Sequence, residues 1–371
     1  MAYSYYALIS IQNGKVSANE TDFPVLISGT YDGTGGEPDI RTVGNGGKIQ
    51  NTDATGGASG SVTVPADLVF SPNTDGSSPY DFEIEKYSAT TGLIVAWVEI
   101  PSIASGTDTE LYMVFGDSGV AASQEDVSGT WESSFKGVYH LGEPSGTCYD
   151  STSNSHDLSN VVGSPSYGYT GKIGDSVASD GGGELLWSDN EMHTGTSLTV
   201  NFWRYRDSVA RNLDGGVAYG GGNALFGSPA EMEWMIGFAT NICNVHISSG
   251  GAQEYIINTA DTIADWVMWG FTYDGSDLDL YRNGAPVGTE PATLTIQDMN
   301  NNGLAVMGRT GGAYDMDGSI DELSVSHTPR DADYMTTTHN SHSDPSTFYT
   351  MGAETGTGGG PGPRSFAVFI G

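Results

Sequence analysis

The stretch Tyr80-Asp-Phe-Glu-Ile-Glu-Lys-Tyr87 alternates apolar and charged side chains at every second position. Successive side chains of a β-strand point to opposite faces, so Phe82 and Ile84 share one face and the three carboxylates share the other. This pattern predicts a half-buried antiparallel strand with its apolar face on a core. We expect the three carboxylates to lie on the solvated face, where they add to an acidic surface.

Short alternating runs of the same kind recur through most of the chain. The 53 glycines and 19 tyrosines, with polar residues crowded between the apolar runs, favour strands and turns over helices. Asn283-Gly284 is a strong signal for a tight hairpin, and the one stretch with helical character, residues 330–336, predicts a turn or two. The predicted strands are 6–11, 23–28, 61–64, 80–87, 93–100, 110–115, 137–141, 198–203, 233–238, 244–247, 266–272, 278–281 and 320–325.

The chain is long enough for two domains, and a polar seam at 119–128 interrupts the strand rhythm. We therefore predict an all-β protein with two antiparallel β-sandwich (jelly-roll) domains in tandem, 1–125 and 126–355. Residues 356–371 read as a Gly/Pro linker and an apolar tail. The tail residues Phe366, Val368, Phe369 and Ile370 are predicted to dock, either on their own sandwich or on the sheet edge of a neighbouring subunit.

The chain is strongly acidic, with a net charge of −33 and a pI near 4.1. Such a surface repels a phosphate backbone, which argues against nucleic-acid binding. It favours solubility at high surface density and supplies oxygen ligands for Ca²⁺. No segment has the composition of a membrane span or of an ordinary export signal at the amino terminus, so we expect a protein acting outside cells to leave by lysis or as part of a particle.

Motifs in the second segment, over most of 131–351, occur in a characteristic order. They are 131–143 (WESSFKGVYHLGE), 150–156 (DSTSNSH), 198–203 (LTVNFW), 272–284 (TYDGSDLDLYRNG) and 318–323 (GSIDEL). In these motifs the segment resembles the concanavalin A-like lectin/glucanase superfamily, in its laminin-G-like form common in phage and bacterial surface proteins. The resemblance implies a lectin-like sandwich.

The first segment resembles a domain of unknown function that often precedes such a lectin-like domain. The resemblance rests on 21–27 (TDFPVLI), 81–86 (DFEIEK), 95–101 (VAWVEIP) and 108–116 (DTELYMVFG), together with Lys15-Val16. The 80–87 stretch therefore belongs to a family signature, which by itself says nothing about catalysis.

Hydrolysis of a glycan is an alternative that Asp81, Glu83 and Glu85 raise. The superfamily's retaining glucanases carry E-x-D-x-E on one strand, whereas here the order differs and lies in the first segment. Residues four apart on a regular strand are about 13 Å apart, while retaining chemistry needs carboxyls about 5 Å apart. Only a bulge would let the side chains converge. We therefore predict no catalytic residues and a non-enzymatic protein.

The resemblance implies a structural Ca²⁺ in many relatives, and Asp150, Asn154 and Asp321 are the candidate ligands. The competing interpretation is that Asp150 and Asn154 form an Asx turn and that Asp321 caps a strand end. The histidines show no metal-binding spacing, and His339 and His342 are expected to be solvated loop residues.

Exposed aromatic side chains at loop edges are the usual platforms for sugars in such sandwiches. The possible platforms here are Trp187, Tyr167, Tyr169, Tyr219 and Tyr314, of which Trp187, Tyr219 and Tyr314 are the chosen candidates, with burial under their own loops as the alternative. Cys148 and Cys243 lack any partner spacing and are expected to be buried free thiols.

These features together predict a structural component of a virion surface, such as a phage head decoration or fibre protein. Its expected partners are other virion proteins or copies of itself, with a cell-surface glycan as a further ligand. A bacterial surface adhesin and a polysaccharide-cleaving glycoside hydrolase are the alternatives.

Overall fold

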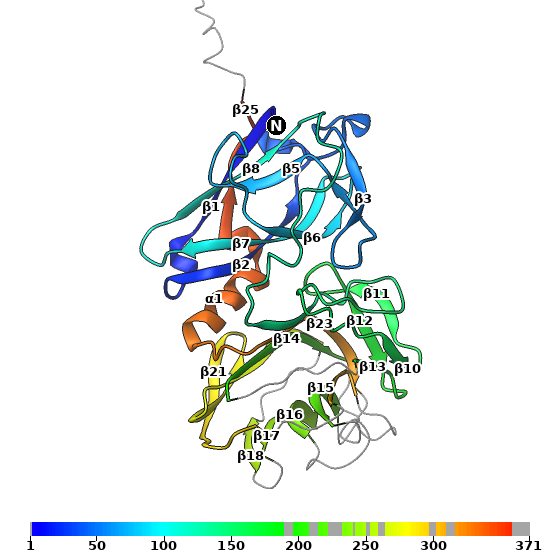
Figure 1. Ribbon diagram of the computed structural model, residues 1–371, viewed down its shortest axis with the longest axis vertical. Helices are drawn as coiled ribbons and strands as arrows, with labels where there is room; N and C mark the ends of the chain where they lie inside the picture. Colours follow the sequence, from blue (N-terminus) through cyan, green and yellow to red (C-terminus); the bar gives the residue numbers. More distant parts are fainter. Residues whose placement is uncertain are drawn as a thin grey trace, which may run out of the picture.

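The computed structural model describes residues 2–188, 196–207, 214–221, 232–239, 242–249, 253–258, 264–296, 302–308 and 316–357. These residues form antiparallel sheets, which confirms the all-β prediction. Two sandwiches lie at opposite ends of the molecule, and helix α1 lies between them (Figure 1). No helix within these ranges has the length and apolarity needed to cross a lipid bilayer.

The first sandwich packs two sheets over an apolar core. One sheet has the order β24-β1-β8-β5, with β25 also paired to β1, and the other has the order β2-β7-β6. Strands β3 (Thr52–Gly56) and β4 (Val62–Pro65) form a separate pair, and three 3-10 turns are η1 (Asn13–Lys15), η2 (Thr34–Gly36) and η3 (Val43–Asn45). The sheet strands are β1 (Tyr5–Ile11), β5 (Leu68–Ser71), β8 (Thr109–Phe115), β24 (Tyr349–Met351), β25 (Thr355–Gly356), β2 (Glu20–Thr30), β6 (Phe82–Tyr87) and β7 (Leu93–Ile103).

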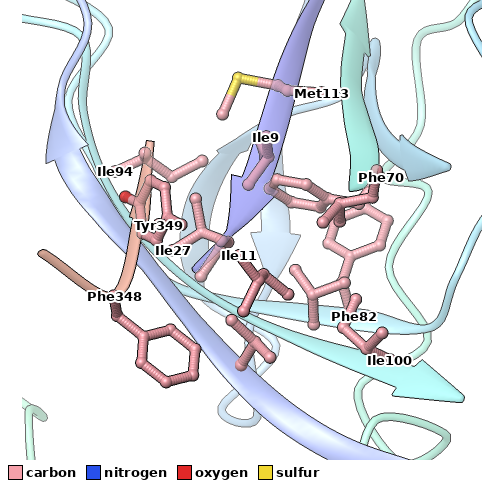
Figure 2. Packing of buried hydrophobic residues seen from close by; sticks show 14 of the residues in the cluster. Ile9, Ile11, Ile27, Phe70, Phe82, Ile94, Ile100, Met113, Phe348 and Tyr349 are labelled. Atoms are coloured by element: carbon pink, nitrogen blue, oxygen red, sulfur yellow. The ribbon is translucent and has the colours of Figure 1, made fainter. Parts of the chain in front are cut away.

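Segments from both ends of the chain build this first core. Figure 2 shows Ile9 and Ile11 of β1 among Phe70, Phe82 and Ile100, with Phe348 and Tyr349 from the far end of the sequence packed beside them. Residues 349–355, placed by sequence in the second domain, and residues 356–357, placed in the linker, pair with the first sandwich along and beside β1. The first sandwich is therefore completed only when the carboxyl-terminal segment returns to it.

The helical segment is longer than the sequence predicted. Helix α1 spans Ala332–Ser343, a further short helix α2 spans Pro345–Phe348, and Asp331 caps α1 by accepting a hydrogen bond from Tyr334 N. Met335 and Tyr334 are buried on the first core, and Ser341 Oγ accepts a hydrogen bond from Leu26 N of β2. Tertiary packing, which local propensity does not reveal, extends the helix.

The second sandwich also has two sheets. The inner sheet has the order β11-β12-β23-β14-β19-β20-β21, with β9 also paired to β23; the outer sheet has the order β10-β13-β22-β15-β16-β17-β18. The inner strands are β9 (Phe135–Tyr139), β11 (Ser166–Thr170), β12 (Asp175–Asp180), β14 (Leu198–Arg206), β19 (Trp266–Tyr273), β20 (Asp277–Arg282), β21 (Ala285–Pro291) and β23 (Asp317–Ser326). The outer strands are β10 (Asn160–Val162), β13 (Leu185–Ser188), β15 (Asp214–Gly221), β16 (Met232–Ala239), β17 (Ile242–Ser248), β18 (Gln253–Asn258) and β22 (Asn302–Val306).

Alternation along β14 explains how one strand serves two cores. Val200 and Phe202 point into the second sandwich, whereas Trp203 lies in the buried cluster of the first. Met268 of β19 does the same on the neighbouring strand. The central strands β14 and β19 of the inner sheet are thus buried on both faces. The outer sheet lies on the side away from the first sandwich (Figure 1).

Two smaller predictions are confirmed. Asn283 and Gly284 connect β20 to β21 with φ values of 50° and 75°, the left-handed backbone that a type I′ turn requires. Cys148 and Cys243 are both buried, and neither forms a disulfide.

Candidate functional site

The three carboxylates of 81–86 do not share a wet face, which corrects the sequence prediction. Asp81 is exposed, but Glu83 is 1% exposed and the side chain of Glu85 is 6% exposed. Phe82 and Ile84 enter the first core as predicted. The opposite face of sheet β2-β7-β6 is covered by the second sandwich, so the charged face of β6 is an interface between the two sandwiches.

A bulge in β6 helps to place Glu85. The register of β6 on β7 shifts between Ile84 and Lys86, which leaves Glu85 as the extra residue. A bulge re-aims the side chain at its own position. Glu83 and Glu85 both reach the same imidazole ring, that of His140, which follows strand β9 of the second sandwich.

A second bulge, in β23, supplies two adjacent carboxylates from the second sandwich. Its register on β14 shifts between Asn201 and Trp203, and Glu322 has φ 53°, a left-handed conformation unusual for a residue with a side chain. Ile320 and Leu323 on either side point into the second core. Asp321 and Glu322 are consequently both turned to the interface, where they are 0% and 5% exposed.

His140 lies at the centre of this group. Its Nδ1 is 2.8 Å from Oε2 of Glu322 and 3.8 Å from Oε2 of Glu85, and its Nε2 is 3.3 Å from Oε2 of Glu83. We call these residues, together with Asp321, the interface cluster. Three of its carboxylates meet one imidazole ring at a junction formed by both sandwiches.

Aromatic side chains enclose the cluster. Trp131 Nε1 donates a hydrogen bond of 2.9 Å to Oε2 of Glu83, and Ser151 Oγ donates one of 2.9 Å to Oε1 of the same residue. Trp97 stacks on the His140 ring with centroids 5.4 Å apart and its Nε1 donates to Glu85 at 3.4 Å. These contacts hold the charged groups in one orientation and exclude water from one side of them.

Burial and mutual repulsion set the protonation of the cluster. Burial opposes ionisation of Glu83, but the His140 imidazolium and the hydrogen bonds to Glu83 outweigh it and lower the pKa of that carboxyl. Burial, followed by the negative charge of Glu322, raises the pKa of Glu85 well above its ordinary value. The pKa of the Asp321 carboxyl is raised well above its ordinary value for the same two reasons. Burial opposes protonation of His140, yet Glu322 and Glu83 raise its pKa well above the ordinary value.

A cavity of about 270 Å³ opens beside the cluster. Glu83, Glu85 and His140 line it together with the β3–β4 turn of the first sandwich and residues 142–145 of the second. Its wall contains Glu143, whose Oε1 accepts a hydrogen bond from Tyr149 N. The cavity is large enough for a small ligand or several waters and gives access to the imidazole ring and the carboxylates.

The residues predicted to bind Ca²⁺ lie in two places. Asp150 accepts four hydrogen bonds, from Val138 N, Thr152 N, Thr152 Oγ1 and His156 N. Asn154 Nδ2 donates hydrogen bonds to Phe135 O and Thr152 Oγ1. The side chains of Asp150 and Asn154 therefore stabilise the loop in which they lie. Asp321 belongs to the interface cluster, where its Oδ2 accepts from Ile173 N at 2.9 Å. Ca²⁺ binding by this set stays a prediction.

Of the three chosen candidate sugar platforms and the docking tail, only Trp187 has a side chain that the structure describes. Trp187 lies in β13, half-buried against Ala305, on the face of the outer sheet opposite the core residue Leu186. Tyr219 lies in β15, where it pairs in register with Leu304 and Trp234. Tyr314 and the docking residues Phe366, Val368, Phe369 and Ile370 lie outside the described residues.

The expectation that His339 and His342 are solvated loop residues is wrong. Both lie in helix α1, and His342 is 8% exposed with its ring edge-on to Trp97 at 5.0 Å. Burial lowers the pKa of His342 to about 3, so this ring stays neutral beside the cluster. One part of the candidate site could be found from the sequence, because His140 and Glu143 place a histidine and a carboxylate in one lectin-like motif. Nothing in the spacing of that motif pointed to Glu83 or Glu322.

Residues 179–334 match the family model described as the concanavalin A-like lectin/glucanases superfamily. A search of curated protein sequences finds no significant match. Among solved structures, domain 4 of AbnA, a GH43 extracellular arabinanase from Geobacillus stearothermophilus in complex with arabinotriose, is 15% identical. The alignment covers 54% of this chain and 96% of that one, with a TM-score of 0.42.

Two further solved structures are similar at 13% identity, each with a TM-score of 0.42. One is from a study of botulinum neurotoxin type C and its interaction with two ganglioside molecules, and the other is the binding domain of Paraclostridial Mosquitocidal Protein 1. The alignments cover 56% of this chain and 51% and 52% of those chains, so this chain spans about half their length. By the family match, residues 179–334 belong to the concanavalin A-like lectin/glucanases superfamily.

Proposed function

We propose that the protein is a non-enzymatic attachment protein that presents its second sandwich to a cell-surface glycan. The lectin-like superfamily match over 179–334 carries this proposal. The outer sheet of that sandwich lies away from the first sandwich, so a ligand can approach it without disturbing the interface (Figure 1). Trp187 on this sheet is a half-buried aromatic residue of the kind that stacks on a sugar ring.

A glycan array probed with the full chain tests this proposal. We expect retention of a subset of glycans, and we expect Trp187→Ala to weaken it. Tyr169→Ala is the comparison variant, because Tyr169 is 53% exposed but lies on β11 of the inner sheet, so a larger loss there would move the platform to that strand. If no glycan is retained, or if both variants behave alike, the attachment role or the assigned platform is wrong.

Hydrolysis is the alternative that the interface cluster raises, since donor oxygens of Glu85 and Glu322 lie within 4.8 Å of each other. A retaining glycosidase places its two carboxyls on opposite sides of the scissile bond. Here His140 contacts both carboxylates and Glu322 is 5% exposed, which leaves no room for a sugar between them. Mass spectrometry of the retained glycans decides the matter, because shortened products would replace the attachment proposal by hydrolysis.

We further propose display on a virion surface, with a bacterial cell surface as the alternative location. The net charge of −33 supports dense display, because like-charged neighbouring copies resist aggregation. Antibody detection in purified particles, in cell envelopes and in the soluble fraction of the producing culture separates the locations. Deleting residues 364–371 tests the tail as the anchor, since unchanged incorporation into particles would exclude that role.

A further inference from the structure

We propose that Glu85, His140 and Glu322 form a binding site for a first-row divalent cation of the Zn²⁺ or Mn²⁺ type, at the junction of the two sandwiches. Glu85 belongs to β6 of the first sandwich and Glu322 to β23 of the inner sheet, so the site uses no strand of the outer sheet on which the glycan-binding proposal rests. It draws one ligand from the first sandwich and two from the second.

The donor atoms are already close enough to share an ion. One donor atom from each of the three residues lies within 4.8 Å of the other two. Zn²⁺ bound tetrahedrally at 2.0–2.1 Å places its ligand atoms about 3.3 Å apart. The distances from His140 Nδ1, 2.8 Å to Glu322 and 3.8 Å to Glu85, bracket that value, so small side-chain rotations suffice.

Unsatisfied acceptors point to a missing positive charge. Within the described part of the chain, no hydrogen-bond donor reaches Oε1 of Glu322 or Oδ1 of Asp321, and both atoms are buried. A buried carboxylate oxygen without a partner costs free energy that a nearby cation or proton recovers. Three carboxyl groups meet the single imidazole of His140, and Asp321 lies in the same cluster, so acidic groups outnumber the one basic group there.

The surroundings of His140 match those of a metal-binding histidine. Nδ1 faces Glu85 and Glu322, whereas Nε2 faces the carboxylate of Glu83 at 3.3 Å. The Glu83 carboxylate near Nε2 favours a proton on that nitrogen, so Nδ1, which hydrogen-bonds Glu322, can bind a metal ion once it loses its own proton. Glu83 is itself held by Trp131 and Ser151, so the orientation of the ring is set before an ion arrives.

The donor set selects the class of ion. One imidazole nitrogen with two carboxylates suits Zn²⁺, Mn²⁺ and similar ions, whereas Ca²⁺ and Mg²⁺ prefer oxygen ligands alone. Glu85 and His140 also line the cavity of about 270 Å³. A fourth coordination position therefore faces the cavity, where water or an oxygen of a small ligand completes the shell.

The test uses the full chain without an affinity tag, stripped with a chelator and then titrated calorimetrically with Zn²⁺, Mn²⁺ or Ca²⁺. We expect about one equivalent of Zn²⁺ or Mn²⁺ per chain, a higher Tm with the ion bound, and weaker binding of Ca²⁺. Glu85→Gln and Glu322→Gln keep side-chain size but remove a ligand charge. Each is expected to weaken binding at least about tenfold, and Glu83→Gln by about 10- to 100-fold through the orientation of His140.

Asp67→Asn is the matched control, because Asp67 is also fully buried but accepts hydrogen bonds from Gln50 N and Asn51 N within the first sandwich. We expect it to lower the Tm of the stripped protein without changing metal stoichiometry. Absence of Zn²⁺ and Mn²⁺ binding to folded wild-type protein would overturn the proposal. Unchanged affinity in both Glu85→Gln and Glu322→Gln would do so as well, and would leave a proton shared between these carboxyls.

Discussion

Oε2 of Glu83 lies 3.3 Å from Nε2 of His140, which joins a strand of the first sandwich to a loop of the second. Trp131 and Ser151 donate hydrogen bonds to the same carboxylate from the second sandwich. This one side chain therefore binds three groups across the junction. The two sandwiches are coupled through it, so changes at Glu83 are expected to affect both.

Glu83→Gln is expected to destabilise the protein by about 3–5 kcal/mol, because it removes one partner of a buried charge pair and leaves the other uncompensated. Urea unfolding followed by tryptophan fluorescence measures the loss. Asp81→Asn, two residues away and exposed, is the control and is expected to change the free energy of unfolding by less than about 0.5 kcal/mol. Equal effects in the two variants would contradict the interface role of Glu83.

The metal-free protein is expected to lose stability as the pH rises above the ordinary pKa values of Glu85 and His140. The folded-state pKa of His140 is raised above 6.5 and that of Glu85 above 4.5, so the folded state holds protons that the unfolded chain releases. Each such group stabilises the folded state fully at pH values below its pKa in the unfolded chain. This contribution to the free energy of unfolding is lost as the pH rises through the pKa of the group in the folded protein. Urea midpoints measured in chelator should follow this direction, and Glu85→Gln should flatten the dependence.

Phe348→Ala is expected to cost about 3–5 kcal/mol, since the side chain is fully buried in the first core. Its loss should unfold the first sandwich although Phe348 lies far from that sandwich in the sequence. Hydrogen exchange of strands β1 and β8 reports this region directly. Faster exchange confined to the second sandwich would contradict the shared core, and Phe348→Leu, which keeps most of the volume, should cost less.

Gly284→Ala is expected to destabilise the β20–β21 hairpin by about 2–4 kcal/mol. The backbone there has φ 75°, and an added Cβ would lie 2.8 Å from Cβ of His339 and 2.9 Å from Met335 O. Gly275→Ala is the matched control, with φ 91° but with a nearest atom, Thr196 O, at 3.4 Å. The difference in Tm between the two variants isolates the contact between the hairpin and helix α1, and equal losses would mean that backbone strain alone decides the effect.

Alternation and turn chemistry made much of the fold predictable. The stretch 198–203 reads as a strand because its apolar residues recur at every second position, and Asn283-Gly284 marks a hairpin because both residues tolerate positive φ. Helix α1 was underestimated, because its length depends on packing against β2. The return of residues 349–357 to β1 was missed, since pairing over such a separation leaves no local signal.

The candidate site was hidden for a related reason. Glu83 and Glu322 lie far apart in sequence, and each sits in a segment whose local pattern is complete without the other. The bulges at Glu85 and Glu322 break the two-residue period that sequence reasoning relies on. Glu85, His140 and Glu322 each look like part of an ordinary strand or loop in the sequence, and they meet only when the two sandwiches pack against each other.

The sequence by itself determined which face of β6 enters the first core, because Phe82 and Ile84 must leave water and a strand has a period of two. It also determined the lectin-like character of residues 179–334. Only the tertiary structure decided what covers the other face of β6. A carboxylate is solvated or buried according to its neighbours, and for Glu83 and Glu85 the neighbour is a second sandwich that brings His140 and Glu322 to meet them.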